Sequence, residues 1–337
     1  MSIDVFSISK VTPELVEDFA NRTWGEARAK LILTEWWIDS IHAETMVAFD
    51  SVMHRVAGIV VAVKSSWRLP NGSSSNTVSI CGWYVAPEYA GQGLGRLLVK
   101  HFDQSTSSRN TVAITEDAVR AFKKLGWTGP FTAQLFLLPL PSLRRSNLIS
   151  DKFSYESYHI SGADLPTDLC DALNQIENDS PVKIGRRVRS SEAWISHLSV
   201  WPKRKRSIHI ISLDGDPIGA FSLRDTDELA ASIYRYARLT YVTDIIFNNQ
   251  DDECLFYACS VIKSVTKRTA GGLVLCTSNN NIANALEKNG WWSKKTILIG
   301  KKIEVKSPLY MLDGELAKIS NNNFDITFSD SDIDLNL

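Results

Sequence analysis

The sequence lacks long apolar runs, paired cysteines and a net charge, and each absence excludes a class of protein. No window of 18 residues is both apolar and free of charge, so we expect no membrane-spanning helix. The five cysteines form no CxxC pair and the six histidines have no HxH or HxxxH spacing, so we expect reduced core thiols and no metal site. The formal net charge of −1 provides no global field for nucleic acid or an anionic membrane.

The sequence also lacks the pattern of a secretory signal peptide. Its first residues mix charges into the sequence and offer no continuous apolar segment, so we expect a cytoplasmic protein. What it has is an ordinary globular composition, with 44% hydrophobic and 22% charged residues, and ten tryptophans. A length of 337 residues favours two domains over one.

Short apolar strands alternate with amphipathic helices in the first part of the chain, which predicts a mixed α/β fold. A glycine-rich turn separates the third strand from a helix that runs through Phe102, and a second helix covers 118–125 before Gly126. The expected strands are residues 45–49, 57–64, 77–85, 111–114 and 131–138, the last closing the first unit.

The second part of the chain repeats this order of elements. Gly219 takes the position of Gly58, and Gly290-Trp291 takes that of Gly126-Trp127. The repeated strands and helices are residues 207–213, 218–223, 239–247, 255–265, 272–277 and 282–288. We therefore expect one fold used twice, with domains at 1–140 and 153–312, a linker at 141–152, and a tail at 313–337 that forms an edge strand or a solvated acidic end.

A glycine loop is the sharpest local signal. Gly91, Gly93 and Gly95 follow the strand that ends at Val85 and lead into a helix. Glycines let backbone N–H groups turn toward a ligand, and the helix N-terminus adds partial positive charge. The loop therefore predicts a pyrophosphate cradle, although its spacing is not that of a dinucleotide fold and no GK[ST] ending follows.

The string VAPEYAGQGLGRLL resembles the acetyl-CoA loop of the GNAT superfamily of N-acetyltransferases, V-x-P-x-[YF]-[RQ]-x-x-G-x-G. Val85, Pro87, Tyr89, Gly93 and Gly95 match, whereas Ala90 replaces the usual Arg or Gln. The Leu125-Gly126-Trp127 ending of the next helix is also similar to the family pattern. The resemblance covers residues 1–140 and extends to a degenerate copy over 153–312.

The resemblance implies two GNAT-like mixed β-sheet domains with flanking helices in tandem. It implies transfer of an acyl group, with acetyl-CoA the favoured donor, by direct attack of a small amine such as an amino sugar or nucleotide-linked sugar. A backbone N–H on the first strand of the cleft would polarise the thioester. The expected CoA-binding residues are Tyr84, Val85, Ala90, Gly91, Gln92, Gly93, Leu94, Gly95, Arg96, Thr115 and Phe122.

Two departures from the family pattern bear on catalysis. Phe122 stands where many members have a Tyr that protonates the CoA thiolate, and Thr115 stands where a helix-opening Asn is common. The general base is unassigned, because the strand 77–85 carries no carboxylate. The nearest catalytic candidates are Tyr84, Glu88 and Glu116, followed by Asp117 and His54, and each of these is more often a solvated or packing residue.

The second copy has lost the loop, since three carboxylates and no glycine follow Phe247, and carboxylates repel a pyrophosphate. Candidate substrate-binding residues are Trp36 and Trp37, with core packing as the alternative, and Asp244. Two basic clusters, residues 186–189 and 203–206, predict either a solvated face or a site for a phosphorylated substrate or RNA.

Two further readings of the chain stay open. The protein could be a CoA-binding scaffold with little activity, or an aminoacyl transferase of the tandem GNAT-like type, which would make an intact CoA loop redundant.

The second copy is also similar to tandem acyltransferases associated with bacterial surface-polysaccharide synthesis. The similar features are Trp194 with Trp201-Pro202, the hairpin at 214–219 and the ending from Ile326. Neither the acceptor nor the oligomeric state follows from the sequence.

Overall fold

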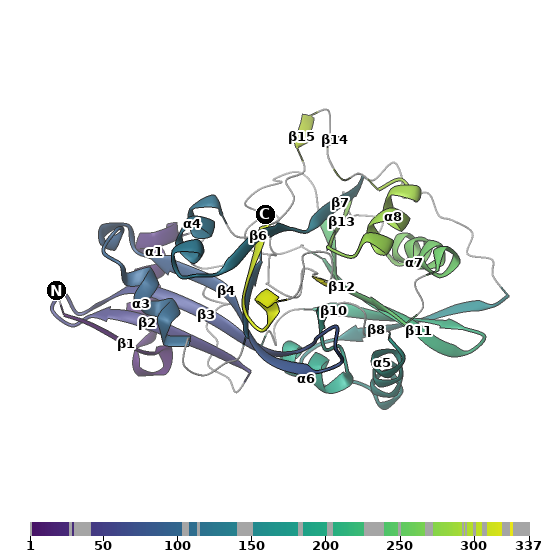
Figure 1. Cartoon of the computed structure of the whole chain (residues 1–337), viewed down its shortest axis with the longest axis horizontal. Coiled ribbons are helices and arrows are strands. Elements are labelled where there is room, and N and C mark those ends of the chain that lie inside the picture. The colour runs from purple at the N-terminus through teal and green to yellow at the C-terminus, as the bar shows by residue number, and fades with distance from the viewer. Residues whose placement is uncertain are drawn as a thin grey trace. The chain divides into compact units, whose positions relative to one another are not determined.

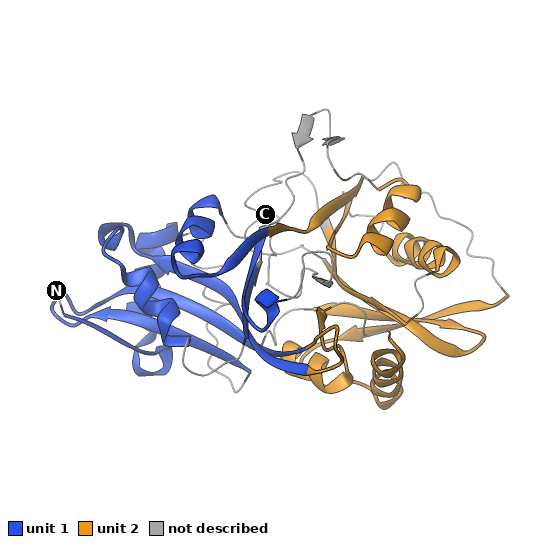
Figure 2. Ribbon diagram, viewed as in Figure 1, with its two compact units in different colours: residues 1–67, 74–130, 310–318 blue, residues 68–73, 131–309, 319–337 orange. Residues whose placement is uncertain are grey.

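The computed structural model divides the chain into two compact units (Figure 2). Unit 1 comprises residues 1–67, 74–130 and 310–318, and unit 2 comprises residues 68–73, 131–309 and 319–337. The residues described are 2–26, 29, 42–102, 108–112, 115–139, 151–180, 185–200, 205–225, 239–248, 251–266, 272–291, 293, 295–298, 301–304, 309–318 and 324–325.

Unit 1 is built on a mixed sheet with the strand order β1-β2-β3-β4-β5-β16-β6 (Figure 1). The hairpin β2–β3 is antiparallel, whereas β4 and β5 are parallel and are joined by a helical crossover. The strands are β1 (Ile3–Ser7), β2 (Ala43–Asp50), β3 (Arg55–Arg68), β4 (Ser74–Val85), β5 (Ser108–Val112), β16 (Leu309–Gly314) and β6 (Thr128–Thr132).

The helices of unit 1 begin and end where local chemistry dictates. Helix α1 (Pro13–Trp24) begins with a proline, whose missing N–H costs nothing at that position, and ends at Gly25. Helix α3 (Leu94–His101) follows a left-handed Gly93, and the hydroxyl of Thr115 caps α4 (Glu116–Lys124). Short 3-10 turns cover Ile8–Lys10, Pro87–Tyr89 and Leu316–Lys318.

Unit 2 contains a second mixed sheet in the order β7-β13-β12-β11-β10-β8. Its strands are β7 (Gln134–Pro139), β8 (Phe153–Ile160), β10 (Arg206–Leu213), β11 (Asp216–Asp225), β12 (Leu239–Phe247) and β13 (Gly272–Thr277). Its helices are α5 (Thr167–Asp179), α6 (Ser191–Val200), α7 (Asp252–Val265) and α8 (Asn280–Lys288). Short strands are β9 (Gly185–Arg187), which pairs with β17 (Phe324–Asp325), and the hairpin β14 (Lys295–Leu298) and β15 (Lys301–Glu304).

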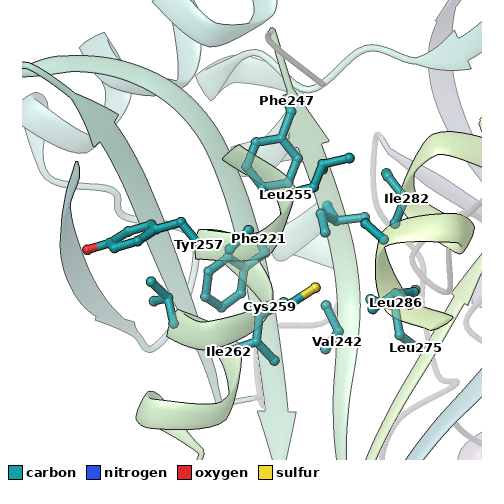
Figure 3. Close-up of a cluster of buried hydrophobic side chains, with 14 of the residues drawn as sticks. Phe221, Val242, Phe247, Leu255, Tyr257, Cys259, Ile262, Leu275, Ile282 and Leu286 are labelled. Carbon is teal, nitrogen blue, oxygen red and sulfur yellow. The ribbon is translucent and has the colours of Figure 1, made fainter. Parts of the chain in front are cut away.

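The main core of unit 2 lies between its sheet and helices α7 and α8 (Figure 3). Phe221, Val242 and Phe247 project from the strands, and Leu255, Ile262, Ile282 and Leu286 project from the helices toward them. Cys259 is buried in the same cluster. No disulfide joins any of the five cysteines, all of which lie in the described residues.

The predicted repeat is present as two α/β units with the same order of elements. Strands β12 and β13 have the predicted bounds, and Gly126 and Gly290 both take positive φ after equivalent helices. Gly58 and Gly219 each face the end of the neighbouring strand. A Cβ on Gly219 would lie 2.0 Å from the Phe247 ring, and one on Gly58 would lie 3.1 Å from the Tyr84 carbonyl oxygen. Among the described helices, none is long and apolar enough to cross a membrane.

Two strands differ from the sequence expectation. Residues 131–138 were expected to close the first unit, but β7 pairs antiparallel with β13 in the second sheet, with Leu273 opposite Leu138. In the first sheet β16 lies beside β5 instead, with Tyr310 opposite Val112. Residues 131–139 therefore belong to unit 2 and residues 310–318 to unit 1, so the compact units do not coincide with the expected boundaries at 140 and 313. Residues 140–150 and 326–337, which hold most of the expected linker and the acidic end, lie outside the described part.

Candidate functional site

The glycine loop of unit 1 forms an exposed turn between β4 and α3. Gly91 and Gly93 have φ of +77° and +80°, which residues with a Cβ rarely adopt. The amides of Leu94, Gly95 and Arg96 lie in the first turn of α3, where a helix offers no intrahelical acceptor. With the partial positive charge of the helix N-terminus, these amides provide the chemistry of an anion site.

Gly95 has a packing role that the motif alone did not reveal. A Cβ on this residue would lie 2.7 Å from Cζ2 of Trp83, and the Trp83 indole N–H donates to the Gly95 carbonyl oxygen at 3.1 Å. Helix α3 therefore lies directly on the indole ring of β4. The sequence placed Trp83 two residues before Val85 but carried no signal for this contact.

A hydrogen-bonded network anchors the segment that precedes the glycines. The Tyr89 hydroxyl donates to Asp50 Oδ2 at 2.8 Å and accepts from Arg55 Nε at 2.9 Å. Hydrogen bonds from the Met53 amide and the Tyr89 hydroxyl lower the pKa of Asp50, while burial raises the pKa of Tyr89. Tyr89 thus connects the loop to the β2–β3 hairpin.

Glu88, a candidate base, belongs to the same anchor. It pairs with Arg22 of α1 and lies 3.5 Å from Arg55 Nη1. Arg22 also donates to the Val56 carbonyl oxygen at 2.8 Å. Two guanidinium partners, which tie Glu88 to α1 and to β3, favour a structural role.

Strands β4 and β5 separate before β4 reaches the loop. Their parallel pairing is limited to Thr77 with Ser108, Val78 with Arg109 and Ser79 with Asn110, although β4 continues to Val85. We call the space between the diverging strands the β4–β5 fork. In unit 2, β12 and β13 pair only as far as Val242 and then diverge as well.

The remaining candidates of unit 1 take different positions. Tyr84 lies on β4 at the fork, half-buried, with its ring edge-to-face with Trp24 at 4.8 Å. Phe122 is buried between Trp83 and Trp127, at centroid distances of 4.8 and 4.5 Å. A phenyl ring has no proton to donate, so Phe122 cannot act as the general acid.

Helix α4 begins with residues that show no catalytic arrangement. The Thr115 hydroxyl accepts from the Ala118 amide at 3.3 Å, and Asn279 caps α8 of the second copy in the same way. Glu116 and Asp117 are exposed in the first turn, and Asp117 pairs with Arg120. His54 lies in the exposed β2–β3 turn with its ring 5.4 Å from that of Phe49.

Asp244 in unit 2 belongs to a buried ion cluster. It pairs with Arg187 and, through Oδ1 at 2.6 Å, with Arg189 Nε. Glu177 pairs in turn with Arg186 at 2.6 Å and with Arg68 at 3.0 Å. The basic cluster at 186–189 is thus not a solvated face, because Arg186, Arg187 and Arg189 are each less than 5% exposed.

The turn of unit 2 that corresponds to the glycine loop carries negative charge. Asp251 caps α7 by accepting from the Cys254 amide at 2.7 Å, and Asp252 and Glu253 follow in the first turn. Residues 249–250 lie outside the described part, as do Trp36, Trp37 and the basic residues 203 and 204. Arg206, the last residue of that cluster, is buried.

Comparisons with known proteins agree with this geometry. Residues 10–127 match the model of the acetyltransferase (GNAT) family. An N-acetyltransferase from Anabaena variabilis is similar in structure with a TM-score of 0.60 and 12% identity, over 93% of this chain and 73% of that one. A tandem GNAT protein from the clavulanic acid biosynthesis pathway also has a TM-score of 0.60 and 12% identity, over 95% of this chain and all of that one.

N-myristoyltransferase of Saccharomyces cerevisiae, solved with bound myristoyl-CoA, has a TM-score of 0.56 and 9% identity, over 96% of this chain and 89% of that one. At these identities the likeness concerns the fold. A comparison of the sequence with curated proteins gives no match.

Proposed function

Because residues 10–127 form a domain of the acetyltransferase (GNAT) family, we propose that this acyltransferase moves an acetyl group from acetyl-CoA to the amine of a small molecule at the β4–β5 fork. The observation that carries the proposal is the run of amides without intrahelical acceptors at the start of α3, which the glycine loop connects to a strand whose parallel partner diverges. Acetyl-CoA supplies an activated thioester carbonyl.

The residues of the glycine loop bind and orient this donor. The amides of Leu94, Gly95 and Arg96 hold the pyrophosphate, and the strand edge between Cys81 and Val85 guides the pantetheine arm into the fork. A backbone N–H of this edge polarises the thioester carbonyl. Orientation supplies most of the rate enhancement, because the neutral amine and the carbonyl carbon are held in contact.

The reaction breaks the C–S bond and forms a C–N bond, and the amine loses one proton. Phe122 carries no exchangeable proton, so the thiolate receives its proton from the amine or from water. This departure favours one alternative, a CoA-binding scaffold with little activity. An amino sugar as acceptor, and a role of the surface-polysaccharide type, remain predictions within the enzyme hypothesis.

Calorimetric titration with acetyl-CoA tests the loop first. Gly93→Glu places a carboxylate at the helix N-terminus and should raise the Kd at least about tenfold. Gly72→Glu is the matched control, since Gly72 is another exposed glycine with φ of +83° and no atom within 4 Å of a Cβ. It should bind as the wild type does.

Thiol release across amines and amino sugars tests the chemistry. We expect release above background for at least one acceptor and none from Gly93→Glu. Binding of acetyl-CoA with only background release would support the scaffold. No binding of acetyl-CoA or CoA would overturn the loop assignment and leave the aminoacyl-transfer alternative.

A further inference from the structure

Strands β4 and β5 share a buried face of neutral polar side chains in the region where they pair and just before it. It comprises Ser75, Thr77, Ser79, Ser108 and Asn110, each no more than 5% exposed, and we call it the β4–β5 polar face. Residues in register on parallel strands project to the same side, which places Ser108 with Thr77 and Asn110 with Ser79. A hydrogen bond of 2.8 Å between the hydroxyls of Ser75 and Ser108 agrees with this assignment.

Asn110 differs from its neighbours on this face. Its side chain is 0% exposed, and within the described part of the chain neither Oδ1 nor Nδ2 has a hydrogen-bond partner. A buried amide left in this state destabilises the fold by about 1–3 kcal/mol for each unmet group. Such groups are rare and are found where a ligand or ordered water completes the bonding.

The position of Asn110 connects it to the fork. It forms the last register pair of the two strands, opposite Ser79, so the fork begins at the next residue. The adjacent residues face the other side of the sheet: the Arg109 guanidinium lies 5.8 Å from the Trp127 ring, and the Thr111 hydroxyl donates to the Ile80 carbonyl oxygen. Asn110 therefore faces away from Trp127 and from Phe122 of α4, which packs on Trp127.

We propose that the Asn110 carboxamide binds the acceptor, and that the acceptor is a vicinal amino alcohol, the class that includes amino sugars. The inference rests on the proposed acetyl transfer at the fork. A carboxamide offers one acceptor and one donor side by side, which match an amine N–H and the oxygen of a hydroxyl on the adjacent carbon. An N–H donated to Oδ1 leaves the nitrogen lone pair for attack on the thioester.

The alternative occupants of the site fit less well. An acidic acceptor would need a cationic partner, and the polar face consists of neutral side chains. An acceptor without hydroxyl groups would leave Nδ2 unpaired. Sites built to hydrogen-bond a substrate hydroxyl reject analogues that lack it, because the buried group is then unsatisfied.

The test compares trans-2-aminocyclohexanol with cyclohexylamine in the thiol-release assay, using the full chain. We expect the wild type to favour the amino alcohol by at least about tenfold in kcat/KM. Asn110→Leu, which replaces the amide with an apolar group of similar size, removes the partners of both the amine and the hydroxyl. It should therefore lower kcat/KM for the amino alcohol more than for cyclohexylamine and reduce the preference to less than about threefold. Ser108→Ala is the matched control, and it should retain the preference.

Stability and cofactor affinity complete the test. Asn110→Leu should melt at or above the wild-type temperature and bind acetyl-CoA unchanged. Equal turnover of both amines by the wild type would overturn the inference while leaving the proposed function intact. Raised stability with an unaltered preference would show a purely structural amide and would also overturn it. If the wild type binds acetyl-CoA but acetylates neither amine, the melting temperature measured with the amino alcohol decides. A rise in the wild type that is absent in Asn110→Leu supports the inference. No rise in the wild type overturns it.

Discussion

Replacing Asp244 with asparagine should destabilise unit 2 by about 3–5 kcal/mol, because the substitution removes a charge that two buried guanidiniums face. Asp244 and Arg189 have fully buried side chains, and the Arg187 side chain is buried as well. An Asn side chain keeps the shape and can still accept the Ile245 amide hydrogen bond, so the loss comes from the charge rather than from a cavity.

Scanning calorimetry of the full chain measures this effect. For a unit of this size, 1 kcal/mol corresponds to a shift of about 2–4 °C, so the midpoint should fall by about 6–20 °C. Asp252→Asn is the matched control in the same unit, because the Asp252–Lys288 pair is largely exposed and contributes about 0–1 kcal/mol.

The contrast between the two variants separates a structural Asp244 from a substrate-binding one. Equal shifts for Asp244→Asn and Asp252→Asn would refute the argument from buried charge. If Asp244→Asn then also lost acyl transfer at unchanged stability, the carboxylate would belong to a substrate site.

Three further changes test other parts of the structure. Burial, with the charge of His159, lowers the pKa of His209 from 6.5 to about 4. As the pH falls, His209 therefore takes up a proton in the unfolded state before it does so in the folded state. The free energy of unfolding should therefore fall by about 2 kcal/mol between pH 7 and 5, and by less in His209→Gln, as urea titrations would show. Gly95→Ala brings a Cβ to 2.7 Å from the Trp83 ring and should weaken acetyl-CoA binding in calorimetry. Tyr89→Phe removes the hydroxyl between Asp50 and Arg55 and should lower the melting temperature by about 2–5 °C, and an unchanged value would contradict the anchoring role.

Local patterns were sufficient for most elements and for the anion loop. Short apolar runs in a repeated order of elements predicted β12 and β13 with their observed bounds, because such runs can be read from the chain itself. The glycines at 91, 93 and 95 predicted a turn that leads into a helix, and in that turn Gly91 and Gly93 take positive φ. Thr115, which stands where the family pattern opens a helix, is the N-cap of α4, and Asn279 is the N-cap of α8.

The buried ion cluster was not visible in the sequence. Arg186, Arg187 and Arg189 form a short basic run, which is typical of a solvated face. Their partner Asp244 lies more than 50 residues away, and only the pairing of charges across that distance makes burial of the guanidiniums favourable. Asn110 was equally inconspicuous, since an Asn in a polar strand gives no sign that folding will remove its hydrogen-bond partners.

The sequence by itself determined that one α/β fold occurs twice and that the first copy has a glycine loop suited to an anion, because periodicity, capping and glycine conformations are local properties. Only the tertiary structure decided which strands complete each sheet. The residues of β7 specify a strand but not its partner, and pairing with β13 is a long-range choice made by the packing of the whole unit. The same long-range packing set the burial of the Asp244 ion cluster and the isolation of the Asn110 side chain, since burial is a property of the fold and not of any short segment.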